Sequence, residues 1–113
     1  MAKKKYKINI ALLGCGKLGQ GIYKLLELKR PDIIENNGID LNIKYILVKH
    51  IKFKRDRAIP KGKITDNIET IINDPSIKIV IDAIGGIEPT YGIIKKFLEK
   101  MILEKNIMEI NFI

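Results

Sequence analysis

The 113-residue sequence contains one cysteine and one histidine. Cys15 has no second cysteine for an internal disulfide, which agrees with a reducing compartment. A lone histidine, His50, excludes a metal site built on a histidine pair. No apolar run approaches the ~20 residues of a membrane helix, and the basic residues 3–7 precede a strand pattern rather than a signal-peptide core. We therefore expect one small cytoplasmic domain with no metal and no membrane partner.

Acidic residues are the minority among the charged ones, and the 21 lysines and arginines leave a net charge of +8. Such an excess suits nucleic acid, an anionic ligand or a lysine-rich surface. The basic residues cluster only at 3–7, which we interpret as a solvated tail, and at 49–57. The sequence shows no helix-turn-helix, zinc spacing or aromatic-studded sheet motif, so we expect no specific nucleic-acid partner.

The most informative segment is residues 10–19, where an apolar strand pattern leads into Gly-x-Gly-x-x-Gly and a helical pattern follows. This context favours a dinucleotide-binding turn. Gly14 permits the tight turn off the strand, Gly16 lacks the Cβ that would keep a pyrophosphate away, and Gly19 lets the helix pack closely. The phosphates would lie against the free N–H groups at the start of the helix.

Alternating strand and helix patterns predict an α/β fold, a Rossmann-like parallel sheet with helices on both faces, as a single partial domain. The strands are expected over about 7–13, 41–48, 64–65 and 77–84, with a last one within 106–113. An apolar stripe over 93–101 indicates a helix between the last two strands.

Two further helices are predicted earlier in the chain. The first begins near Lys17 and ends at Pro31, which leaves 32–38 as a polar connection. The second is brief, over 67–73, with Asp66 as its N-cap.

The end of the second strand distinguishes between cofactors. NAD-binding domains place an Asp or Glu there to accept hydrogen bonds from the ribose hydroxyl groups, but the first carboxylate here is Asp56. A 2′-phosphate would form charge-assisted hydrogen bonds with cations instead, and the candidates are Lys49, Lys52, Lys54 and Arg55. We predict a preference for NADP, with NAD possible. The alternative is a solvated basic loop, and His50 is either a phosphate contact or a half-exposed loop residue.

Three segments match the motifs of one family in order and spacing. Residues 12–21 (LLGCGKLGQG) are similar to a Gly-x-Gly-x-Val-Gly-x-Gly opening. Residues 48–55 carry Val-Lys-His and then Lys-Arg, where the family has Val-Arg-Asp followed by basic residues. Residues 80–89 (VIDAIGGIEP) are similar to Val-Val-Glu-Leu-Ile-Gly-Gly-x-Glu-Pro. The chain thus resembles the amino-terminal NAD(P)-binding domain of homoserine dehydrogenase over about residues 7–105, and residues 106–113 diverge.

The resemblance implies an NAD(P)-dependent oxidoreductase of amino-acid biosynthesis, which interconverts homoserine and aspartate semialdehyde by hydride transfer. It also implies that Lys49 matches the family's arginine beside the adenosine ribose, and that Ile84 and the two glycines after it lie near the nicotinamide. The predicted cofactor-binding residues are Gly14, Gly16, Lys17, Leu18, Gly19, Lys49, His50, Ile84, Gly85 and Gly86.

Two departures from the family limit the activity expected here. The family's Thr-Ala-Asn-Lys, whose lysine helps handle the substrate proton, aligns best with residues 109–112, where Glu109 replaces the threonine and Phe112 the lysine. The family's substrate domain is also missing from these 113 residues. We therefore predict no catalytic residue, a truncated or frameshifted enzyme that is inactive alone, and self-association through surfaces exposed by truncation. The alternative is a non-catalytic NADP-binding or interaction module.

Two other residues have competing interpretations. Cys15 precedes a helix N-terminus, which would lower the pKa of a thiol, but we favour a role as small filler between glycines. Asp82 either takes the place of a family glutamate or caps the turn that follows its strand.

Overall fold

A computed structural model describes residues 5–84, 96, 99–101, 103–105 and 107–111. Within these residues the chain forms a five-stranded, all-parallel sheet in the order β3-β2-β1-β4-β5. The strands are β1 (Tyr6–Leu13), β2 (Ile39–Leu47), β3 (Ile64–Thr65), β4 (Ile77–Asp82) and β5 (Met108–Asn111). The helices are α1 (Lys17–Asn37), α2 (Ile68–Ile72) and the short 3-10 helix η1 (Lys61–Lys63).

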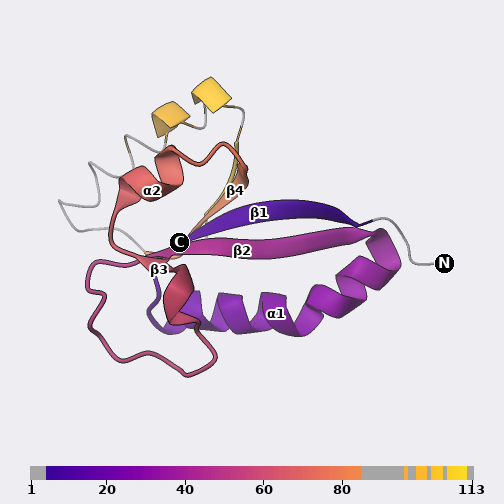
Figure 1. The fold of residues 1–113 in the computed structure, drawn as a ribbon, viewed down its shortest axis with the longest axis horizontal. Helices are drawn as coiled ribbons and strands as arrows, with labels where there is room; N and C mark the ends of the chain where they lie inside the picture. The colour runs from indigo at the N-terminus through magenta and orange to yellow at the C-terminus, as the bar shows by residue number, and fades with distance from the viewer. Residues whose placement is uncertain (1–4, 85–95, 97–98, 102, 106, 112–113) are drawn as a thin grey trace.

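The helices cover both faces of the sheet. In Figure 1, α1 lies below β1 and β2, while α2 and the yellow C-terminal helical turns lie above them. The strand order reverses between β1 and β4, because the chain runs from β1 toward β3 and then crosses back to β4 and β5. The predicted Rossmann-like arrangement is confirmed, and its ligand crevice is expected at this reversal, beyond the carboxyl ends of the strands.

Residues of β1 alternate between two hydrophobic clusters. Ile10 and Leu12 pack toward α1 with Tyr23, whereas Ala11 and Leu13 pack on the opposite side with the α2 residue Ile71. These four consecutive residues, 10–13, are each 0–2% exposed. Such burial is expected of a central parallel strand that is covered on both faces.

Helix α1 corrects the predicted boundary at Pro31. The helix continues through this proline to Asn37, and it ends where Gly38 adopts a left-handed conformation with φ of 68°. Pro31 removes one helical hydrogen bond, but the turn before it is fastened to the start of β2. The Arg30 guanidinium donates to both carboxylate oxygens of Asp40, at 2.5 and 3.1 Å. The segment 32–38, predicted as a polar connection, is therefore helical as far as Asn37.

The other elements match the sequence patterns with smaller shifts. The strand at 64–65 and the tail strand are present, and β4 ends at Asp82 rather than residue 84. Asn67, not Asp66, caps α2, because its side-chain oxygen accepts the Glu69 N–H at 3.0 Å. Residues 96, 99–101 and 103–105 are helical, whereas Gly85, Gly86 and most of the stripe over 93–101 lie outside the described residues. No helix in the described part of the chain is long and apolar enough to cross a membrane.

Candidate dinucleotide site

The turn from β1 into α1 requires glycine at its first position. Gly14 has φ of +98°, a conformation that residues with a side chain rarely adopt. A Cβ there would lie 2.9 Å from Ile84 Cγ1 and 3.1 Å from the Ala83 carbonyl oxygen. The Gly14 N–H donates to the Leu47 carbonyl at 2.8 Å, which ties the turn to the end of β2. The turn therefore lies where the ends of β1, β2 and β4 meet.

The other two glycines of the motif have different surroundings. A Cβ on Gly19 would lie 2.2 Å from the Gly14 carbonyl oxygen, so the first turn of α1 rests directly on the glycine loop, residues 14–19. At Gly16 no heavy atom lies within 4 Å of the position that a Cβ would take. Gly16 thus presents bare backbone to open space, as close approach of a phosphate requires.

The start of α1 is suited to an anion. Gly16 is the N-cap, no side chain caps it, and the first turn contains no acidic residue. Lys17 and Leu18 are exposed there. The unpaired N–H groups and the positive end of a 21-residue helix favour negative charge at this position. Together with the open face of Gly16, this arrangement fits a pyrophosphate group.

The segment after β2, residues 49–57, forms a basic loop in which one cation faces inward. The Arg55 guanidinium donates to three carbonyl groups of its own loop, those of His50 at 2.8 Å, Phe53 at 2.9 Å and Ile51 at 3.3 Å. The His50 ring packs against the Phe53 ring, with centroids 4.8 Å apart. Arg55 is therefore engaged with backbone, whereas Lys49, Lys52 and Lys54 are exposed.

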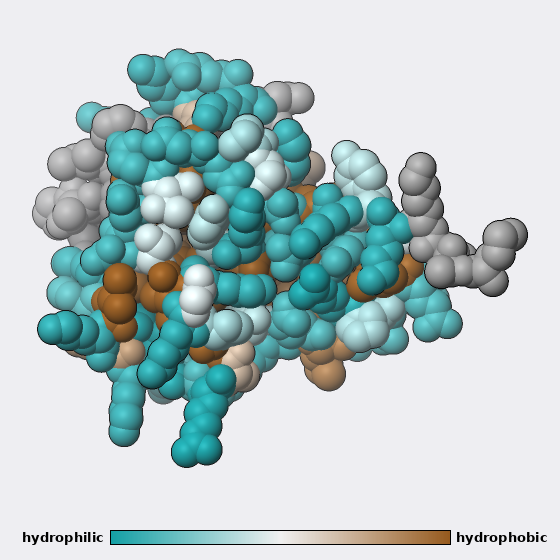
Figure 2. All heavy atoms as spheres, viewed as in Figure 1, coloured by the Kyte–Doolittle hydropathy of each residue, from teal (hydrophilic) through white to brown (hydrophobic). Residues whose placement is uncertain are grey.

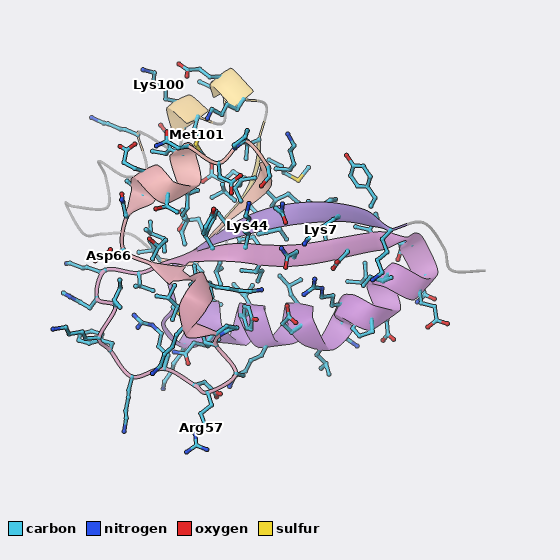
Figure 3. All side chains as sticks on the ribbon, in the orientation of Figure 1. Lys7, Lys44, Arg57, Asp66, Lys100 and Met101 are labelled. Atoms are coloured by element: carbon cyan, nitrogen blue, oxygen red, sulfur yellow. The ribbon has the colours of Figure 1, made fainter. Side chains whose placement is uncertain are left out.

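A cavity of about 700 Å³ opens beside the basic loop. Its cationic lining residues are Lys52, Lys54, Arg55, Arg57 and Lys61. Figure 3 shows Arg57 pointing away from the ribbon at the bottom of the loop, and Figure 2 shows the hydrophilic surface interrupted by small hydrophobic areas. All of its lining residues lie within 51–64, so the cavity borders the basic loop and not the glycine loop.

Gln20 and Asp56 connect the two loops, and the sequence motifs did not indicate either residue. Gln20 donates to the Cys15 carbonyl at 2.9 Å and accepts the Asp56 N–H at 3.1 Å. The Asp56 carboxylate pairs with Lys24 of α1 and accepts the Ala58 N–H at 2.9 Å. The only signal in the sequence was the position of Gln20 immediately after the last glycine of the motif.

Cys15 has the character of a packed residue rather than a nucleophile. Its side chain is 8% exposed. Burial raises the pKa of the Cys15 thiol, and the positive charge of the neighbouring Arg55 opposes this only in part. A thiol with a raised pKa is a poor nucleophile near neutral pH, which supports the filler role that we favoured.

On the β4 side, Ile84 follows the strand and lies against the glycine loop. Its N–H donates to Asp82 Oδ1 at 3.2 Å, so the buried Asp82 does cap the turn after β4. The structure thus brings together Ile84, the glycine loop and the start of α1. Gly85 and Gly86 lie outside the described residues. Among the residues that are described, no three His, Cys, Asp or Glu side chains gather as metal ligands.

The chain is similar to homoserine dehydrogenases in sequence and in structure. Residues 14–106 match the family described as homoserine dehydrogenase, NAD binding domain. The Bacillus subtilis homoserine dehydrogenase is 35% identical over 83 residues, which are 74% of this chain and 19% of that protein. The Helicobacter pylori enzyme is 32% identical over 96 residues, 85% of this chain and 22% of that protein.

A crystal structure of S. aureus homoserine dehydrogenase superposes with a TM-score of 0.80 at 36% identity, and covers 94% of this chain and 26% of that one. The chain therefore spans about a fifth to a quarter of the length of the relatives that it matches. The family match over most of the chain, the shared fold and the geometry of the glycine loop agree. The chain belongs to the homoserine dehydrogenase NAD-binding domain family.

Proposed function

We propose that this chain binds NADP(H) in preference to NAD(H), as the cofactor-binding part of a homoserine dehydrogenase. The observation that carries the preference is the state of Asp56, the first carboxylate after β2. Asp56 pairs with Lys24 and accepts a backbone N–H, so it is occupied by contacts within the protein. Lys52 and Lys54 of the basic loop are exposed and line the cavity beside it, where each could pair with a 2′-phosphate.

In this proposal the complete enzyme interconverts homoserine and aspartate semialdehyde, and the bound nicotinamide supplies the hydride chemistry. The residues of this chain bind and orient the cofactor. The glycine loop and the start of α1 hold the pyrophosphate, and Ile84 supports the nicotinamide side together with Gly85 and Gly86. The cytoplasmic location and the cofactor contacts of individual residues stay predictions.

Fluorescence titration of the 113-residue chain with NADPH and NADH tests the preference. A charge-assisted hydrogen bond contributes about 1.5–3 kcal/mol, so NADPH should bind about tenfold more tightly or better. The double variant Lys52→Gln, Lys54→Gln should lose affinity for NADPH and leave NADH unchanged. Lys29→Gln removes a charge from the exposed middle of α1 and serves as the control. Equal dissociation constants for the two cofactors would contradict the preference.

A non-catalytic binding module is the second candidate, because the lysine of the family's Thr-Ala-Asn-Lys is replaced by Phe112. Both candidates predict NADPH binding without catalysis by this chain. An assay of homoserine oxidation therefore distinguishes both of them from a chain that is active alone. We expect retained cofactor binding without turnover. Turnover by the 113-residue chain would contradict the absence of catalytic residues.

A further inference from the structure

The glycine loop and the basic loop are joined by side chains whose contacts are all within the protein. Gln20 uses both ends of its amide: Nε2 donates to the Cys15 carbonyl at 2.9 Å, and Oε1 accepts the Asp56 N–H at 3.1 Å. The bridged residues lie 41 positions apart in the numbering of the chain, Cys15 against Asp56. A single half-buried amide thus fixes the distance between the two loops.

Arg55 holds the basic loop together from within. Its two terminal nitrogens donate to the carbonyl groups of His50, Ile51 and Phe53, which closes the basic loop around the guanidinium. Its Nε atom is buried without a hydrogen-bond partner among the described residues. Arg55 therefore fixes the shape of the loop that Gln20 ties to the glycine loop.

These contacts give Arg55 a different role from that of the neighbouring lysines. A direct contact with a 2′-phosphate would draw the guanidinium away from three carbonyl groups and give up three hydrogen bonds to a charged donor. The planar, forked guanidinium suits several fixed acceptors at once, which the point charge of a lysine does not. Arg55 is built to hold backbone, whereas Lys52 and Lys54 extend from the exposed side of the loop.

We propose that Gln20 and Arg55 are positioning residues: Gln20 clamps the basic loop to the glycine loop, Arg55 holds the basic loop in shape, and together they keep the cofactor site formed before the ligand arrives. The inference rests on the proposed cofactor role of these loops. A preformed site spares the ligand the entropic cost of ordering the loop. Because the basic loop also carries the lysines proposed for the 2′-phosphate, loss of either residue should weaken NADPH binding at least as much as NADH binding, with the same pattern in both variants.

Cofactor titration of Arg55→Met and Gln20→Leu measures this effect. Loss of one such contact should raise the dissociation constant of NADPH by about three- to tenfold in both variants. Lys29→Met removes a charge from the exposed face of α1 and should change neither cofactor's affinity. The double variant should lose less than the sum of the single losses, because both residues hold the same loop. Loss of NADPH affinity in Arg55→Met with wild-type affinity in Gln20→Leu would make Arg55 a phosphate ligand and overturn the clamp.

The sole cysteine offers a readout that needs no cofactor. Cys15 is buried and its carbonyl accepts the Gln20 amide, so its alkylation by iodoacetamide should be about three- to tenfold faster in Gln20→Leu, as expected when about one hydrogen bond is lost. Arg55→Met also removes a charge that favours the thiolate, so Gln20→Leu is the cleaner variant. Thermal midpoints measured alongside distinguish local opening from global unfolding.

The two readouts separate the two proposals. Faster alkylation with no cofactor binding by any form of the chain would refute the proposed function and leave the clamp standing. Wild-type alkylation rates in both variants would overturn the clamp, whatever the cofactor affinities are.

Discussion

Gly19 and Gly21 lie two residues apart on α1, but their surroundings are opposite. A Cβ on Gly19 would lie 2.2 Å from the Gly14 carbonyl oxygen, whereas a Cβ on Gly21 would meet nothing within 4 Å. At the residue scale, this difference distinguishes a glycine required for close packing from one that only weakens a helix.

Gly19→Ala should therefore destabilise the chain by about 1–3 kcal/mol, because the helix must move off the glycine loop to admit the methyl group. Gly21→Ala should stabilise it by about 0.4–1 kcal/mol, because alanine restricts the unfolded chain and fits the exposed helical position. Urea unfolding of both variants checks the pair. Similar stability changes in the two variants would contradict the close contact at Gly19.

The glycine roles and the cationic end of β2 could be predicted because they depend on neighbours in the sequence. The contacts of Gln20 could not, because they depend on where the loop after β2 folds back onto α1, and those of Arg55 depend on how that loop turns around its guanidinium. Arg55 shows the limit clearly. Its charge marked it as a phosphate ligand, and only the position of three carbonyl groups assigns it to the loop backbone.

At the scale of elements, a polar network joins β2 to the turn before β4. Asp74 accepts hydrogen bonds from the Tyr45 hydroxyl at 2.7 Å and the Ser76 hydroxyl at 2.6 Å, and it pairs with Lys44 at 2.5 Å. Lys44, labelled in Figure 3, also donates to Ser76. Burial acts to raise the pKa of Asp74, but the hydrogen bonds outweigh it and hold that pKa well below the usual range.

A lowered pKa in the folded state means that the Asp74 carboxylate stabilises the fold above the unfolded pKa of about 3.9. Asp74→Asn should cost about 1–3 kcal/mol at pH 7. The difference from wild type should shrink as the pH falls below about 4, where the Asp74 carboxylate of the unfolded chain takes up a proton while that of the folded chain stays ionised. Urea unfolding at pH 7 and at pH 3 measures it, with the exposed Asp66→Asn as the matched control. A difference that is constant across this range would contradict the network.

The element boundaries show why local patterns give only part of the fold. Pro31 is a helix breaker by local rules, yet the Arg30–Asp40 contact fastens the turn before it and α1 continues to Asn37. Asp66 and Asn67 are both good N-caps, and the choice between them depends on which side chain reaches the Glu69 N–H. A contact between two elements accompanies the first case, and the local reach of one side chain decided the second.

At the scale of the whole molecule, the reversal of strand order between β1 and β4 places the glycine loop and Ile84 at one crevice. The alternation of strand and helix patterns in the sequence predicted this topology, because the helical connections between parallel strands are almost always right-handed. Self-association stays a prediction; the exposed Met108 and Ile110 of the outermost strand β5 are the apolar side chains that it would use.

The central claim is that the glycine loop and the basic loop together hold a nicotinamide dinucleotide phosphate. Amide NMR spectra of the chain titrated with NADPH test this claim most directly. We predict saturable shifts at Gly14, Gly16 and Gly19 and in the basic loop, with NADH shifting the glycine loop but leaving Lys52 and Lys54 less affected. Shifts that are absent, that do not saturate, or that lie away from both loops would contradict the account.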